Sequence, residues 1–177
     1  MEALGQTRRG SSLTFGDTCD SFDDFVRLHF DPLARALAMI TMDTGLAADA
    51  AQDAFLRLHL RWRERETLDD PVAWLYRVAM NRSKDYRRQV RRAARLFERL
   101  TAQATSDSAA VYWAPGPDFI RLVETLPKQQ RVAAVLFYHA DLSTEQIAGV
   151  MRISEGAVKS HLHRAREALR PLLEAER

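Results

Sequence analysis

Hydrophobic positions recur along most of the chain with the period of an α-helix. The first such series begins at Ser21, and Pro32 within it is expected to kink or restart the helix. Further helical ranges follow at 47–63, 71–95, 118–126 and 127–139. The period of two that marks half-buried strands persists nowhere, so the sequence predicts an all-α fold.

Two stretches lack the helical period and divide the chain. Residues 1–20 are rich in Gly, Ser, Thr and Asp, which is typical of a mobile tail. Residues 98–117 include a run without periodicity in which two prolines flank Gly116, the composition of a linker. The sequence therefore predicts two small helical domains, 21–97 and 118–177, joined by a flexible linker.

The second domain is expected to end in two short helices separated by a tight turn. Ser143 opens the sequence STEQ, a capping-box pattern, and Ser154 is expected to cap the last helix. That last helix has one apolar stripe, formed by Val158, Leu162, Ala165 and Leu169. Polar side chains occupy its opposite side and flanks: Lys159, Ser160, His163 and Arg164. A recognition helix in the major groove of DNA has this arrangement. Any amphipathic surface helix shares part of it, but the two caps around the turn favour DNA contact.

Composition sets further bounds on the protein. The 177 residues are 46% hydrophobic, which is enough for packed cores. The single cysteine, Cys19, excludes an internal disulfide, and no Cys/His cluster has the spacing of a zinc site. The sequence has no apolar run of about 18 residues and no signal-peptide core at its start, so we expect a cytoplasmic protein.

The charge distribution is uneven, although the net charge is only +2. Residues 77–95 contain eight basic residues and one acid, Asp85, so the rest of the chain carries a net charge of −5. A solvated helix face usually alternates in sign, whereas this excess repels itself unless phosphates neutralise it. Asn81, on the same helix, can present a donor and an acceptor to a base edge. The pattern favours nucleic-acid binding over a merely solvated face.

The helix expected over 47–63 has two different faces. One carries an ordinary core stripe, formed by Ala51, Phe55, Leu58 and Trp62. The other mixes acids with leucines, namely Asp49, Gln52, Asp53, Leu56 and Leu60. Leucines among acids on an outward face indicate a docking surface, but single exposed leucines are common, so both interpretations stay open.

Three ordered motifs resemble those of bacterial RNA polymerase sigma factors, specifically the small extracytoplasmic-function (ECF) group. They are DAAQDAFLRL (49–58), PVAWLYRVAMNRSKDYRRQVRR (71–92) and, within 126–166, LPKQQR followed by LSTEQIAGVMRISEGAVKSHLHRAR. They look like the core-binding helix of region 2, the helix of region 2 that recognises the minus-ten promoter element, and region 4. The resemblance covers about 21–173, and it implies a region 2 bundle over 21–97 and a region 4 helix-turn-helix over 118–177.

The resemblance also implies roles for individual residues. Contact with the clamp helices of the polymerase β′ subunit would involve Asp49, Gln52, Asp53, Leu56 and Arg57. Recognition of the minus-ten element would involve Asn81, Asp85, Arg88, Arg91 and Arg92, with the loop over 64–70 near a flipped base. Recognition of the minus-thirty-five element would involve Lys159, Ser160, His161, His163 and Arg164. Region 4 would also rest on the polymerase β flap, and an anti-sigma factor is an expected partner.

Three positions depart from the family pattern. Arg152 lies in the turn where glycine is common, so the turn must avoid the left-handed conformation or bear about 1 kcal/mol of strain. Ala157 replaces a usual threonine and His161 a usual arginine, which removes one hydroxyl contact and one fixed charge. Readout of the minus-thirty-five element is therefore expected to differ in detail.

Two other classes of function explain less of the sequence. A free-standing operator-binding regulator accounts for the helix-turn-helix, but not for the motif at 49–58 or the basic helix. An enzyme is disfavoured because the sequence shows no carboxylate pair, nucleophile elbow, phosphate loop or metal-ligand spacing. His161 and His163 are two residues apart and point toward different sides of a helix, so we expect neither a metal nor a cofactor.

Overall fold

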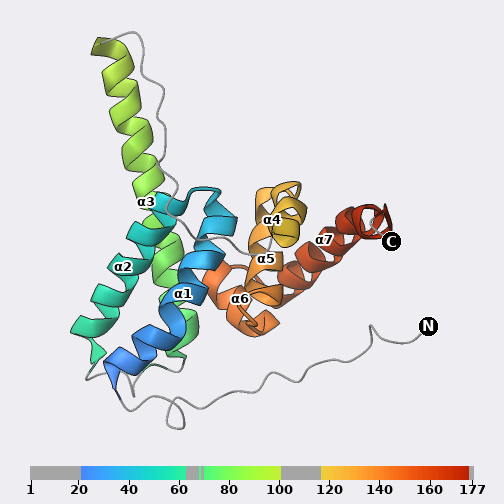
Figure 1. The fold of residues 1–177 in the computed structure, drawn as a ribbon, viewed down its shortest axis with the longest axis horizontal. Coiled ribbons are helices and arrows are strands. Elements are labelled where there is room, and N and C mark those ends of the chain that lie inside the picture. The colour runs from blue at the N-terminus through green and yellow to red at the C-terminus, as the bar shows by residue number, and fades with distance from the viewer. Residues whose placement is uncertain (1–20, 63–67, 69, 101–116, 176–177) are drawn as a thin grey trace.

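The computed structural model describes residues 21–62, 68, 70–100 and 117–175, and within them the chain forms seven α-helices and no strand (Figure 1). The helices are α1 (Phe22–Thr41), α2 (Thr44–Leu60), α3 (Pro71–Leu100), α4 (Pro117–Glu124), α5 (Lys128–Tyr138), α6 (Thr144–Met151) and α7 (Glu155–Ala175). The all-α prediction is confirmed. The predicted tail over 1–20 and most of the predicted linker lie outside the described residues.

The first helix runs through Pro32, so the expectation that it restarts there is wrong. Pro32 is exposed, and so is Leu28 one turn earlier, whose carbonyl loses its helical partner to the proline ring. Water can bind that carbonyl, while the fully buried Leu33 and Leu37 hold the following turns in the core. Burial of these leucines offsets the cost of the proline.

Side-chain and backbone caps place the helix boundaries differently from the hydrophobic pattern. Asp43 Oδ1 accepts a hydrogen bond from the backbone N–H of Leu46 at 2.9 Å, which starts α2 three residues before the expected position. The same helix ends at Leu60, three residues earlier than expected. In contrast, α3 continues five residues beyond its expected end, to Leu100, because residues 96–100 contain neither Gly nor Pro.

The first three helices enclose a core of large apolar side chains. The fully buried members come from all three helices: Phe25, Leu33, Leu37, Met39, Leu58 and Leu75. Trp62 lies against this core, with its ring centroid 5.4 Å from that of Phe25. The predicted core stripe is therefore confirmed for Ala51, Phe55 and Leu58 on α2, and half-buried Trp62 continues it just beyond the end of the helix.

The helix-turn-helix forms from α6 and α7 as predicted. The Ser143 hydroxyl accepts the Gln146 backbone N–H at 3.1 Å, and Gln146 Oε1 accepts the Ser143 backbone N–H at 2.7 Å. Ser154 Oγ accepts the Ala157 backbone N–H at 3.2 Å, which caps α7. The predicted apolar stripe of α7 is buried: Val158, Leu162, Ala165 and Leu169.

Arg152 ends α6 in the left-handed conformation, with a φ of 59°, so the turn is of the strained kind. We expect Arg152→Gly to raise the free energy of unfolding by about 0.5–1 kcal/mol, because glycine adopts this conformation without a Cβ clash. Urea denaturation followed by circular dichroism measures the change. Arg164→Gly is the control, since it places glycine within α7 and should lower the same free energy by about 1 kcal/mol. If Arg152→Gly and Arg164→Gly lowered the free energy of unfolding by similar amounts, the strain at Arg152 would be contradicted.

The two groups of helices pack against each other. Helix α6 lies against α3, while α4 and α5 lie against α1. Their buried side chains form one continuous core. Figure 1 shows α5 and α6 beside α1 and α3, while the C-terminal part of α3 continues beyond the body of the molecule. The predicted domains are thus in contact.

Candidate nucleic-acid interface

Helix α3 presents a basic face to solvent. Its exposed cations include Lys84, Arg88 and Arg92, and Asn81 and Asp85 lie half-buried among them. Arg88 Nη1 lies 3.7 Å from Asp85 Oδ1, and both side chains are at least half exposed, so this pair contributes little to stability. The side chain of Arg91 lies outside the described part of the chain. The face therefore offers positive charge to phosphates.

Two cations of the same helix point into the molecule instead. The Arg82 guanidinium pairs with Asp53 of α2, with Nε 2.6 Å from Oδ2. The Arg87 guanidinium donates to the backbone carbonyl of Thr41 at the end of α1. The prediction treated the basic residues of 77–95 as one surface, and for these two that is wrong. They tie α3 to its neighbouring helices.

The sequence does contain a signal for Arg82. It lies four residues after Val78 and four before Tyr86, both of which pack against the core. Residues at this spacing share one face of a helix. Arg82 therefore lies on the inward face of α3, and only the identity of its partner needed the structure.

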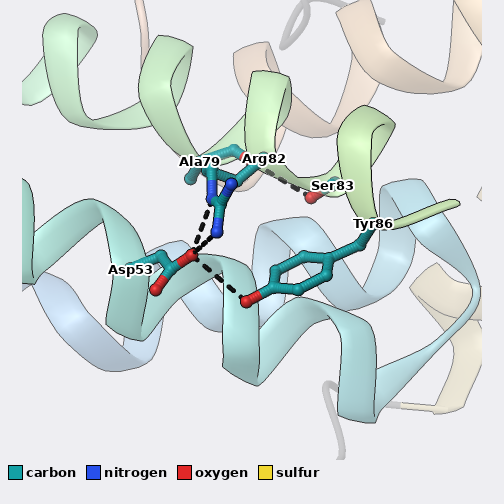
Figure 2. Close-up of polar contacts among 5 residues, drawn as sticks. All are labelled: Asp53, Ala79, Arg82, Ser83 and Tyr86. Atoms are coloured by element: carbon teal, nitrogen blue, oxygen red, sulfur yellow. Dashed lines mark hydrogen bonds and ion pairs between the residues drawn. The ribbon is translucent and has the colours of Figure 1, made fainter. Parts of the chain in front are cut away.

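Asp53, Arg82 and Tyr86 form a small polar cluster between α2 and α3 (Figure 2). Asp53 Oδ2 accepts hydrogen bonds from Arg82 and from the Tyr86 hydroxyl, the latter at 3.1 Å. The Arg82 guanidinium also lies over the Tyr86 ring, 4.9 Å from its centroid. Figure 2 shows the carboxylate turned toward α3, where both partners meet it. Asp53, predicted to contact polymerase, thus already binds within the protein.

The Arg82 hydrogen bond, helped by that of Tyr86, lowers the pKa of the Asp53 carboxyl below its ordinary 3.8, against the opposing effect of partial burial. A carboxyl whose pKa is lower in the folded state than in the unfolded state stabilises the fold at pH values above the unfolded-state pKa. This stabilisation is lost as the pH falls through the folded-state pKa. We expect Asp53→Asn to reduce the free energy of unfolding at pH 7 by about 1–2 kcal/mol. Urea denaturation at pH values from 7 to 3 measures the free energy of unfolding of the parent and of Asp53→Asn. The difference between the two should stay constant and shrink only below about pH 4.

Asp85→Asn is the control for this measurement, because the pair that Asp85 forms with Arg88 is exposed to solvent. Its effect at pH 7 should stay within about 0.5 kcal/mol. A loss as large as that of Asp53→Asn, or a difference that already shrinks near pH 6, would contradict the role of the half-buried Asp53–Arg82 pair.

The outward side of α2 carries an exposed surface, which we call the α2 patch: Asp49, Gln52, Leu56, Arg57 and Leu60. Leu56 is 58% exposed and Leu60 77%. Two large apolar side chains this open, one turn apart among polar ones, form a surface suited to docking. Asp53 lies at the edge of the patch, facing inward.

Helix α7 presents most of its predicted DNA-reading residues to solvent. The exposed ones are Lys159, Ser160, His163 and Arg164. Lys159 Nζ lies 2.8 Å from Glu155 Oε1. This contact lowers the pKa of the Glu155 carboxyl, and a hydrogen bond from the Thr144 hydroxyl lowers it further. His161 differs from the prediction, because it is half-buried and its Nδ1 has no hydrogen-bond partner among the described residues. The structure thus exposes four of the five candidates.

The described residues include no group of three or more His, Cys, Asp or Glu side chains placed to hold a metal ion. Within the same residues, every helix is too short or too polar to cross a membrane.

Comparison with known families matches both halves of the chain. A model described as Sigma-70 region 2 matches residues 25–93, and one described as Sigma-70, region 4 matches residues 118–169. The RNA polymerase sigma-E factor of Streptomyces coelicolor is 33% identical over 160 residues, which cover 87% of this chain and 86% of the relative. The ECF RNA polymerase sigma factor SigM of Bacillus subtilis is 27% identical over 155 residues, covering 86% and 94%.

Solved structures show the same fold. The sigma factor RpoE of Bartonella quintana, crystallised with the anti-sigma factor NepR, matches with a TM-score of 0.69 and 23% identity, over 88% of this chain and 98% of that one. CnrH, solved with the cytosolic domain of CnrY, matches with a TM-score of 0.57 and 27% identity, over 88% and 89%.

Proposed function

The chain belongs to the sigma-70 family of RNA polymerase sigma factors, within its extracytoplasmic-function group, and on this premise we propose that it binds core polymerase and directs it to promoters. One observation carries the proposal. The exposed α2 patch and the exposed basic face of α3 lie on neighbouring helices that the Asp53–Arg82 pair joins. A protein contact and a DNA contact therefore sit on one packed unit.

The α2 patch is the proposed contact with the clamp helices of the β′ subunit. Its two exposed leucines can fill apolar pockets, while Asp49, Gln52 and Arg57 form a polar rim around them. For Asp53 we propose a structural role in addition to the predicted polymerase contact. We propose that its ion pair with Arg82 holds α2 against α3, so that a force applied to one helix is transmitted to the other.

The basic face of α3 is the proposed contact with the minus-ten element. Arg88 and Arg92 supply charge to phosphates, and Asn81 can read a base edge through its amide. Arg91 belongs to the same proposed set by position. Asp85, beside Arg88, can keep that guanidinium oriented.

Helix α7 is the proposed reader of the minus-thirty-five element. Its exposed Ser160 and His163 face the groove in this proposal, with Lys159 and Arg164 on phosphates. His161 contributes less than the prediction assumed, because part of its ring is buried. Region 4 also carries the proposed contact with the β flap.

We further infer that an anti-sigma factor binds and regulates this protein, because the similar sigma factor RpoE was solved in complex with the anti-sigma factor NepR. Sigma factors are non-enzymatic initiation factors, so the proposed role needs no catalytic residue in this chain. RNA synthesis would belong to core polymerase.

Reconstituted transcription tests the function. Purified protein and core polymerase are mixed with a library of randomised upstream sequences, and the transcripts are sequenced. We expect transcripts only with both proteins present, from templates that share two elements at a fixed spacing. The rival function, an operator-binding regulator, predicts tight and specific DNA binding without core polymerase. Absence of directed transcription with active core would contradict the proposal.

A further inference from the structure

One glutamine side chain joins the N-termini of two helices from different regions. Gln146 Oε1 accepts the Ser143 backbone N–H in the capping box of α6. Its Nε2 donates to Asp70 Oδ2 at 2.5 Å, across 76 positions of sequence. Asp70 Oδ1 in turn accepts the Ala73 backbone N–H at 2.8 Å, which caps α3.

The chemistry of the partners fixes the orientation of this amide. A carboxylate only accepts hydrogen bonds, so the NH₂ of Gln146 must face Asp70. The backbone N–H of Ser143 only donates, so the carbonyl oxygen of the same amide must face Ser143. Both ends of the side chain are therefore bonded within the protein only while regions 2 and 4 are docked.

Other contacts support the docked arrangement. Helix α6 packs on α3, and α5 and α4 pack on α1, within one continuous core. Burial, and then the positive charge of Arg35 on α1, lower the pKa of His139 at the end of α5. A charge on α1 thus acts on a side chain of region 4.

Both regions also line a cavity at the same seam. A cavity of about 250 Å³ lies between α1, α3 and the start of α5, and its lining includes Lys84, Arg87, Arg88 and Lys128 but no acid. Lys128 belongs to region 4, so both regions line this cavity, and it is complete only while they are docked. Apolar contact and the Gln146–Asp70 bond favour the closed state.

The closed state is too small to read two promoter elements at once. Elements at minus ten and minus thirty-five lie roughly 25 base pairs apart, or ~85 Å at about 3.4 Å per pair. Helix α3, the longest element among the described residues, has 30 residues and spans about 45 Å at about 1.5 Å per residue, and region 4 packs against α1 and α3 rather than beyond them. Reading both elements requires the regions to separate.

We propose that the free protein occupies a closed state in which the Gln146–Asp70 hydrogen bond latches region 4 onto region 2, and that this latch must open before both promoter elements are bound. The consequence for promoters rests on the proposed function. The latch itself does not, and can be measured on the free protein.

Two substitutions break the latch while keeping both helix caps. Asp70→Asn leaves an oxygen for the Ala73 N–H but turns a donor toward the Gln146 NH₂. Gln146→Glu keeps an acceptor for the Ser143 N–H but turns a carboxylate toward Asp70. The double variant exchanges donor and acceptor, because the amide at position 70 can now donate to the carboxylate at position 146. It should restore the bond.

The test measures the distance between regions 2 and 4 in the full-length free protein. Spin labels are attached to Asp31→Cys on α1 and Ala168→Cys on α7, both exposed positions, in a Cys19→Ser background. Pulsed electron paramagnetic resonance then gives the distribution of distances. We expect a narrow short distance for the parent and the double variant. Each single variant should raise the ratio of long to short distances about tenfold or more.

Controls and outcomes separate the latch from the promoter function. Gln129→Ala changes an exposed glutamine of region 4 and should leave the distribution unchanged. Thermal unfolding checks that each variant is folded. Identical distributions in all variants, or a double variant as open as the singles, would overturn the latch. If the distances behave as expected but the single variants do not bind a two-element promoter faster with core polymerase, the latch stands and its role at promoters is wrong.

Discussion

Replacing Arg88 and Arg92 together with alanine should weaken promoter binding by the polymerase complex about 100-fold. Both side chains are exposed on α3, and Arg88 forms a 3.7 Å surface pair with Asp85. Each charge-assisted bond to a phosphate contributes about 1.5–3 kcal/mol, and partial screening reduces that figure for exposed groups. Two such losses correspond to about two orders of magnitude in affinity.

The salt dependence of binding identifies the cause. Losing two phosphate contacts should reduce the slope of log K against log salt concentration by about 1.5, since each contact contributes about 0.7–0.9. Fluorescence anisotropy with labelled promoter DNA over a salt series measures both affinity and slope. Arg27→Ala combined with Arg121→Ala removes two exposed arginines from α1 and α4 and should change neither. An unchanged slope in the Arg88/Arg92 variant would assign the basic face of α3 to something other than DNA.

The hydrophobic period predicted the elements well because it reports which side of each helix is buried. It identified the core stripe of α2 and that of α7, and all four stripe residues of α7 are buried. The caps at Ser143 and Ser154 were also readable, since a cap acts within three or four residues along the chain. Local chemistry was enough for these features.

Contacts between residues far apart in the sequence could not be predicted in the same way. The period shows that Arg82 faces inward, but it does not show that Asp53, 29 residues earlier, receives it. The sequence assigned the α2 motif to polymerase and the basic helix to DNA. The structure joins Asp53 of the first to Arg82 of the second. The continuous course of α1 through Pro32 has the same origin, because burial of Leu33 and Leu37 outweighs a local rule.

Docking of the two regions depends on side chains even farther apart. Gln146 has a sufficient local role in its capping box, so nothing in the sequence near it indicates a second bond to Asp70. His161 is a similar case, since its place on the helix predicts a DNA contact while its surroundings bury part of the ring. Each residue has a local role that the sequence near it predicts and a tertiary contact that this sequence does not predict.

Leu56→Asp should abolish measurable binding to core polymerase, with an affinity loss of about 100-fold or more. Leu56 is 58% exposed on α2, so the free protein loses little and its free energy of unfolding should change by less than about 0.5 kcal/mol. In a complex, the substitution removes an apolar anchor and buries a carboxylate that lacks a partner. Binding of labelled protein to core polymerase, measured by anisotropy, gives the loss.

Leu28→Asp provides a matched control, since Leu28 is 52% exposed on α1 and lies outside the α2 patch. It should bind core polymerase as the parent does. The contrast tests position rather than hydrophobicity, because both variants exchange one exposed leucine for one carboxylate on a helix surface. Equal losses in the two variants would indicate a general effect of the added charge, and full binding by Leu56→Asp would move the polymerase contact away from α2.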